Sequence, residues 1–156
     1  MAPSNSAPWR VILWSGLLAG TLDLTYALIV YGLLGAKPIR ILQGIASGLL
    51  GASSFQGGWE TAALGTALHF LIALGAAAVY YALSRKIVLL TKHPIVSGLS
   101  YGVAVYLFMN FIVLPLSAVH RGHFTVTSVV IALIPLMLCV GLPIALIVHR
   151  YPALHP

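Results

Sequence analysis

The sequence predicts an all-α integral membrane protein, a bundle of four transmembrane helices in a single membrane domain over residues 1–156. The first observation is composition: of 156 residues, 60% are hydrophobic and 6% are charged. Soluble domains carry about 25% charged residues, so this chain cannot cover a water-exposed surface. The second is a series of four long apolar runs. The third is that none of them alternates polar with apolar residues, which argues against the other spanning architecture, a closed β-barrel.

Each of the four runs is close to the roughly 20 residues that a spanning helix needs. We predict transmembrane helices over about residues 11–34, 61–83, 95–116 and 126–148. At 1.5 Å per residue, the first run reaches about 36 Å, enough to cross a hydrocarbon core of about 30 Å with some tilt. It follows Arg10 as a signal peptide would, but it is too long for one and contains an acid, so we expect it to be retained.

A shorter amphipathic segment separates the first two runs. Residues 39–52 are too polar to span a membrane and too apolar for a solvated loop. A bend is expected at Pro38, after which the apolar side chains fall on one helical stripe. We therefore predict a short interfacial or re-entrant helix. The stripe consists of Ile41, Leu42, Ile45, Leu49 and Leu50.

The basic residues predict how the chain is oriented. The formal net charge is +6, but the Lys and Arg residues are sparse and lie between apolar runs. This favours membrane lipids over nucleic acid as partners. Cytoplasmic loops carry an excess of Lys and Arg, and a count of five against three places both termini in the cytoplasm. The five are Arg10, Arg85, Lys86, Lys92 and Arg150, and the three are Lys37, Arg40 and Arg121.

Asp23 is the most informative polar residue, because it lies in the middle of the first run. An acid at a helix centre costs roughly 2.5–3.5 kcal/mol on the insertion scale, and such residues usually face a bundle interior or a cavity. Gly16, Gly20, Asp23 and Ala27 follow helical spacing and form a stripe of small residues that lets another helix approach closely. We therefore expect Asp23 to point at a neighbouring helix.

Two further runs each carry a polar residue at a similar depth. Counted from the cytoplasmic side at 1.5 Å per residue, Asp23, His69 and Asn110 fall within about 5 Å of one another in depth. The sequence therefore predicts one buried polar cluster. Two interpretations stay open. In the first, the cluster packs the helices together through hydrogen bonds. In the second, it binds a proton or a small ligand, because an Asp–His pair can exchange a proton near neutral pH.

Other candidate residues indicate weaker contacts. Arg40 and Gln43, in the amphipathic segment, are candidates to bind a lipid headgroup or an anionic ligand, and Tyr106, one turn before Asn110, is a further candidate for lipid or ligand contact. The single cysteine, Cys139, can form no intrachain disulfide, and no Cys/His spacing typical of metal sites occurs, so no metal or cofactor is predicted. No nucleophile–base arrangement, P-loop, dinucleotide fingerprint or HExxH motif is present, so nothing indicates an enzyme.

The middle third of the chain contains an intramembrane His, an aromatic residue, two prolines, a Gly-Leu step and a Met at characteristic positions: His69, Tyr80, Pro94, Gly98, Leu99, Met109, Val113, Pro115 and Leu116. Through these residues it resembles a family of uncharacterised bacterial inner-membrane proteins that is distantly similar to the YagU-like proteins. The resemblance implies a multi-pass protein of the bacterial inner membrane, and no reaction. We expect a non-enzymatic protein, with a subunit of a small transporter or channel, or a scaffold for a partner membrane protein, as alternatives; transport would favour a homo-oligomer.

Overall fold

The computed structural model describes residues 8–118 and 125–151, and all the regular elements in these two ranges are helical. Four helices in this part are long and apolar enough to cross a membrane, which confirms that prediction. The first two are α1 (Pro8–Leu33) and α3 (Gly58–Ser84). The third runs through α5 (Pro94–Phe108), η2 (Met109–Val113) and α6 (Leu114–Leu116). The fourth runs through α7 (Val126–Pro135), η3 (Leu136–Gly141) and α8 (Leu142–Arg150).

Three short elements connect these helices. After α1, the chain forms α2 (Pro38–Leu50) and η1 (Gly51–Gln56), and α4 (Val88–Lys92) joins α3 to α5. Pro38 occupies the first turn of α2, where its missing N–H is not needed. Gly51 ends the helix with a φ of +64° and donates its N–H to the carbonyl of Ser47. A glycine adopts this left-handed conformation without the steric penalty of a side chain.

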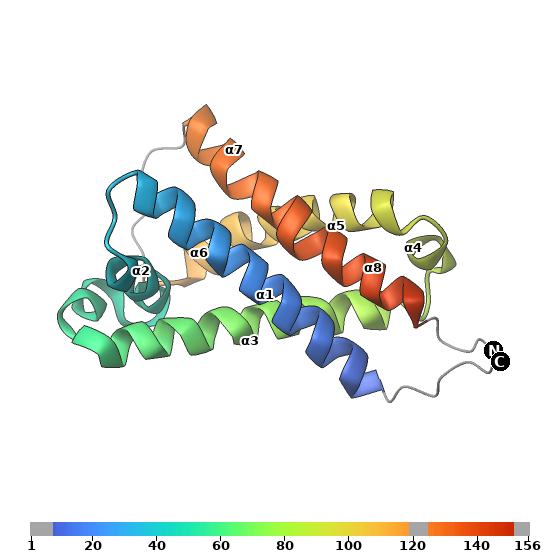
Figure 1. The fold of residues 1–156 in the computed structure, drawn as a ribbon, viewed down its shortest axis with the longest axis horizontal. Coiled ribbons are helices and arrows are strands. Elements are labelled where there is room, and N and C mark those ends of the chain that lie inside the picture. Colours follow the sequence, from blue (N-terminus) through green and yellow to red (C-terminus); the bar gives the residue numbers. More distant parts are fainter. Residues whose placement is uncertain (1–7, 119–124, 152–156) are drawn as a thin grey trace.

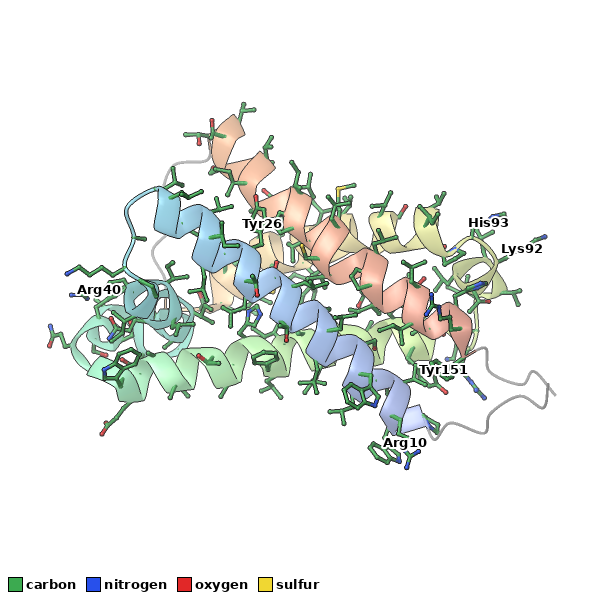
Figure 2. All side chains as sticks on the ribbon, viewed as in Figure 1. Arg10, Tyr26, Arg40, Lys92, His93 and Tyr151 are labelled. Atoms are coloured by element: carbon green, nitrogen blue, oxygen red, sulfur yellow. The ribbon has the colours of Figure 1, made fainter. Side chains whose placement is uncertain are left out.

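Helix α1 lies between α3 and the fourth helix, and α5 packs against the other side of η3 and α8 (Figure 1). The start of α1 and the end of α8 therefore meet at one end of the molecule, together with α4. All five of the basic residues counted for the cytoplasmic side lie here, and we call this the basic end. Figure 2 shows Arg10 and Lys92 at this end and Arg40 at the opposite one. Arg121, counted for the other side, lies outside the described residues.

Glycines set how closely α5 and the fourth helix approach. A Cβ atom added to Gly98 would lie 2.9 Å from both the carbonyl oxygen of Gly141 and the Cα of Leu142. One added to Gly141 would lie 2.7 Å from the backbone nitrogen of Gly102. The two backbones are thus in direct contact, as in other small-residue helix crossings in membranes.

Both of the later spanning helices contain a wide π-helical turn that ends two residues before a proline. Segment η2 ends at Val113, before Pro115, and η3 ends at Gly141, before Pro143. In a regular α-helix the proline ring would clash with the carbonyl four residues earlier. A π turn shifts that carbonyl, and such turns occur often at functional sites. The sequence analysis did not anticipate either π turn.

Candidate functional site

The candidate site lies where α1 crosses α3, and glycines of α1 make the crossing close. A Cβ atom added to Gly16 would lie 2.9 Å from the Cα of Leu74, and one added to Gly20 would lie 2.9 Å from Cδ1 of Phe70. Both glycines are buried. The small-residue stripe predicted for α1 therefore faces α3. Asp23 follows Gly20 by three residues, so its side chain lies on the same side of the helix.

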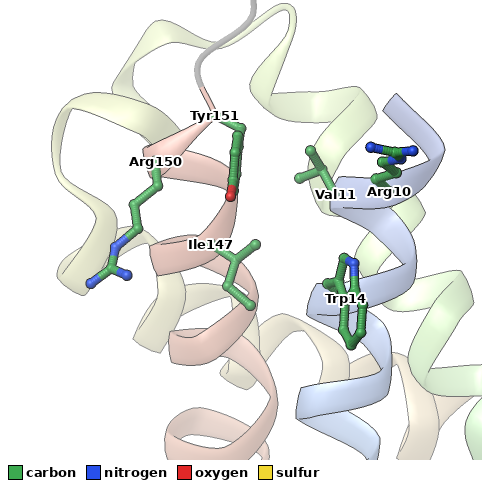
Figure 3. Close-up of a pocket in the computed structure, with 6 residues that line it drawn as sticks. All are labelled: Arg10, Val11, Trp14, Ile147, Arg150 and Tyr151. Atoms are coloured by element: carbon green, nitrogen blue, oxygen red, sulfur yellow. The ribbon is translucent and has the colours of Figure 1, made fainter. Parts of the chain in front are cut away.

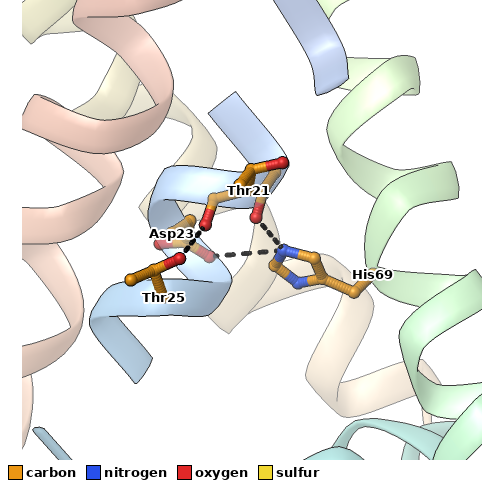
Figure 4. A network of polar contacts seen from close by, with 5 residues as sticks. Thr21, Asp23, Thr25 and His69 are labelled. Atoms are coloured by element: carbon orange, nitrogen blue, oxygen red, sulfur yellow. Dashed lines mark hydrogen bonds and ion pairs between the residues drawn. The ribbon is translucent and has the colours of Figure 1, made fainter. Parts of the chain in front are cut away.

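The imidazole of His69 joins the two helices. Its Nε2 lies 2.8 Å from the carbonyl oxygen of Gly20 and 4.0 Å from Oδ2 of Asp23 (Figure 4). A carbonyl oxygen only accepts hydrogen bonds, so Nε2 carries a proton and donates it. The ring also meets that of Phe70 edge-on, with centroids 5.6 Å apart. Two contacts of different kinds therefore fix the orientation of the imidazole.

The Asp23 carboxylate is held less tightly. Within the described residues, the carboxylate of Asp23 forms an ion pair with His69. The distance of 4.0 Å between Oδ2 and Nε2 is longer than a hydrogen bond. The side chains of His69 and Asp23 are 14% and 21% exposed, so neither is fully enclosed. Helix α1 also packs against η3, so the fourth spanning helix lies on another side of α1. The neighbouring Thr25 hydroxyl donates within α1, to the carbonyl of Thr21 at 2.7 Å.

The structure gives Asn110 a local hydrogen bond. Its Nδ2 donates to the carbonyl of Tyr106 at 2.9 Å, one turn earlier in the same spanning helix. The side chain of Tyr106 is buried, with 8% exposed. The described contacts thus bring together two members of the predicted cluster, Asp23 and His69. A place for Asn110 in the same cluster stays a prediction.

Arg40 and Gln43 both contact the turn that follows their own helix. Arg40 donates to the carbonyl of Phe55 at 2.9 Å and lies over the ring of that residue. Gln43 is 2% exposed and donates to the carbonyl of Gly58 at 2.9 Å. Arg40 is exposed and keeps further donors for a lipid headgroup, whereas the amide of Gln43 is already engaged. Lipid or ligand contact at these residues stays a prediction.

The partner that orients His69 was not predicted from the sequence. That partner is a backbone carbonyl, which no side-chain pattern reveals. A signal was nevertheless present, because the stripe containing Gly20 brings the α1 backbone close enough for a side chain of α3 to reach it. In the part of the chain that the structure describes, no three His, Cys, Asp or Glu side chains lie together as metal ligands would.

Comparisons of the chain with protein-family models, with curated proteins and with solved structures gave no match. The family resemblance drawn from the sequence therefore stays an expectation, and the candidate site is interpreted from its geometry.

Proposed function

We propose that this protein is a non-enzymatic, multi-pass protein of the bacterial inner membrane, folded as a four-helix bundle, whose Asp23–His69 pair binds a proton in the middle of the bilayer. The observation that carries the proposal is the geometry of the imidazole. Its Nε2 donates to Gly20 and lies 4.0 Å from the carboxylate, so the ring can be neutral or charged without leaving its place.

The two protonation states differ in how they compensate the intramembrane acid. With Nε2–H donating to Gly20, a neutral ring keeps Nδ1 as the atom that accepts a second proton. The resulting imidazolium attracts a carboxylate 4 Å away by about 4 kcal/mol at an effective dielectric constant of about 20. That is similar to the insertion cost of about 2.5–3.5 kcal/mol for Asp. When the ring loses its proton to solvent this attraction disappears, so the charges of the two groups are coupled and the pair acts as one unit.

Orientation and the role of α2 belong to the same proposal. The basic end carries five of the eight Lys and Arg residues, which supports a cytoplasmic location for both termini. Helix α2 then lies on the periplasmic side, as a short interfacial or re-entrant helix. It presents Leu49 and Leu50 on its surface, at 64% and 41% exposure, which supports contact with lipid.

Proton binding is testable by infrared spectroscopy because the sequence has only two acidic side chains, Asp23 and Glu60. The protein is reconstituted in lipid bilayers and titrated between about pH 5 and pH 8, the range in which an imidazole changes charge. We expect the carboxyl and imidazole bands to change together in the wild type and in Glu60→Gln. The change in the carboxyl band should disappear in Asp23→Asn.

A packing role predicts a different result. His69→Gln keeps an N–H donor for the carbonyl of Gly20 but cannot be protonated in this range. If the pair binds a proton, this variant keeps most of its thermal stability and loses the titration. If the wild type shows no titration of the carboxyl band, and Asp23→Asn only lowers the melting temperature, the pair serves packing alone and the proposal is wrong.

An apolar groove favours a second candidate role, as one subunit of a homo-oligomeric transporter or channel. It has a volume of about 520 Å³, and its walls come from α3 and the third spanning helix. A Cβ atom added to Gly75, in this groove, would meet nothing within 4 Å, so a side chain there is accessible to a second copy. Gly75→Cys in a Cys139→Ala background should then form disulfide-linked dimers in membranes, whereas Gly44→Cys, equally unobstructed but on α2, should not. Equal cross-linking at both positions would contradict this role.

A further inference from the structure

A second hollow lies at the basic end, between the first turns of α1 and the last turns of α8. It has a volume of about 350 Å³. Figure 3 shows side chains of α1 on one wall and side chains from the end of α8 on the other, with Ile147 and Tyr151 on the side of α8 that faces α1. The wall of α1 consists of Arg10, Val11 and Trp14, and the opposite wall consists of Ile147, Arg150 and Tyr151.

Within residues 8–118 and 125–151, neither arginine of this hollow lies near an acidic side chain. Asp23 is thirteen residues along α1 from Arg10, about 20 Å at 1.5 Å per residue, and Glu60 begins α3 at the opposite end of the molecule. Beyond about 10 Å, charges are largely screened at ordinary ionic strength. The interaction described for Arg10 is with the ring of Trp9, 5.3 Å from the guanidinium carbon. Neither of the two acidic side chains in the sequence is therefore placed to neutralise these arginines, which leaves both available to an external anion.

The lining of the hollow matches a phospholipid from headgroup to acyl chain. Trp14 and Tyr151 are 66% and 42% exposed, which is typical of aromatic side chains at the membrane surface. Val11 on the α1 wall and Ile147 on the α8 wall provide apolar surface next to the arginines. The guanidinium of Arg150 lies on the outer side of α8 in Figure 3, but the side chain is exposed and can rotate toward a shared anion.

From these observations we infer that the hollow between α1 and α8 binds the phosphate headgroup of an anionic phospholipid, with an acyl chain between Val11 and Ile147. An arginine guanidinium binds phosphate oxygens through two parallel hydrogen bonds, whereas a lysine ammonium acts as a point charge and does not form this pair of bonds. Basic hollows between transmembrane helices on the cytoplasmic side are suited to such headgroups. The inference depends on membrane insertion and is independent of proton binding by Asp23 and His69.

The test uses the full chain, purified in detergent and stripped of lipid, with phosphatidylglycerol as the anionic probe and phosphatidylcholine as the zwitterionic one. Native mass spectrometry reports the occupancy of each. We expect the wild type to bind phosphatidylglycerol more tightly. The variant Arg10→Gln/Arg150→Gln should bind it about 30-fold more weakly, because each Lys or Arg near a membrane surface contributes about fivefold.

A matched control removes the same charge from the same end of the molecule. Arg85→Gln/Lys86→Gln leaves the lining of the hollow intact, and we expect it to weaken binding by less than about fivefold. If both double variants lose affinity equally, the lipid responds to general surface charge and the inference is wrong. It is also wrong if phosphatidylcholine binds as tightly as phosphatidylglycerol. Full displacement of the lipid by inorganic phosphate alone would assign the hollow to a free anion instead.

Two further measurements test the inference even if the Gln variant does not fold. Arg10→Lys/Arg150→Lys keeps both charges but not the paired hydrogen bonds, so its affinity should fall between those of the wild type and the Gln variant. In the wild type, an increase of ionic strength from about 0.1 M to about 1 M shortens the screening length from about 10 Å to about 3 Å. Binding of phosphatidylglycerol should weaken accordingly, and an unchanged affinity would overturn the inference.

Discussion

Replacement of Gly65 by alanine tests how α2 is held on the spanning helices. Gly65 is buried where α3 meets α2. A Cβ atom there would overlap the carbonyl oxygen of Leu42 and would lie 2.9 Å from its carbonyl carbon and 3.2 Å from the nitrogen of Ala46. All three are backbone atoms of α2, so no side-chain rotation relieves the overlap. The whole helix must move away from α3.

The magnitude follows from two opposing effects. An extra methyl group in a tightly packed contact costs about 1–3 kcal/mol. Alanine is favoured over glycine within a helix by about 1 kcal/mol. Gly75→Ala, ten residues further along the same helix, brings the second effect without the first, since nothing lies within 4 Å of the added atom. The difference in unfolding free energy between the two variants should therefore equal the overpacking term, about 1–3 kcal/mol.

Unfolding can be measured in detergent micelles by titration with a denaturing detergent, with circular dichroism as the readout. A second readout is the rate at which a maleimide labels Ser47→Cys, a position that is 7% exposed, in a Cys139→Ala background. Labelling should become faster when Gly65→Ala is added and stay unchanged when Gly75→Ala is added. Equal stability and equal labelling of the two variants would refute the close contact between α2 and α3.

Three further predictions use the same measurement of unfolding free energy. Tyr101→Phe should lose about 1 kcal/mol, because the hydroxyl donates to the carbonyl of Ala76 at 2.7 Å, and a loss of a few tenths or less would contradict that bond. Gln43→Leu should lose about 1–3 kcal/mol, because it leaves the carbonyl of Gly58 without this donor; an unchanged stability would mean that the amide is dispensable. Thr125→Ala should lose about 1 kcal/mol and Thr125→Ser much less, because the side-chain oxygen caps α7.

The spanning helices could be predicted from the sequence because length and hydropathy are local properties of the chain. The side of α1 that faces α3 was also predictable, since Gly16 and Gly20 are four residues apart and so share one face of a helix. Depth counting placed Asp23 and His69 at one level, and the structure has them 4.0 Å apart. Counting works here because two nearly straight helices cross close to the level of both residues.

The remaining features depend on how elements are placed in space. Asn110 lies in the π turn η2, which widens the helix and changes the side on which the residue lies, so depth alone does not fix its neighbours. The hydrogen bonds of Arg40 and Gln43 run to Phe55 and Gly58, which the chain reaches only by folding back after α2. The stripe of apolar residues in α2 contains no information about that return path.

The packing and proton-binding interpretations of His69 concern different atoms of the same ring. Nε2 donates to the carbonyl of Gly20, and that bond fastens α3 to α1 at a point where the glycine brings the backbones together. Nδ1 takes no part in that bond, so a second proton there need not disturb the helix contact. Asp23 lies too far from the ring for a hydrogen bond and close enough to neutralise it. A histidine that only packed the helices would need the hydrogen bond to Gly20 alone. Asp23 beside it would then only destabilise the protein. Under the proposed function the acid has a role, because it compensates the charge of the protonated ring.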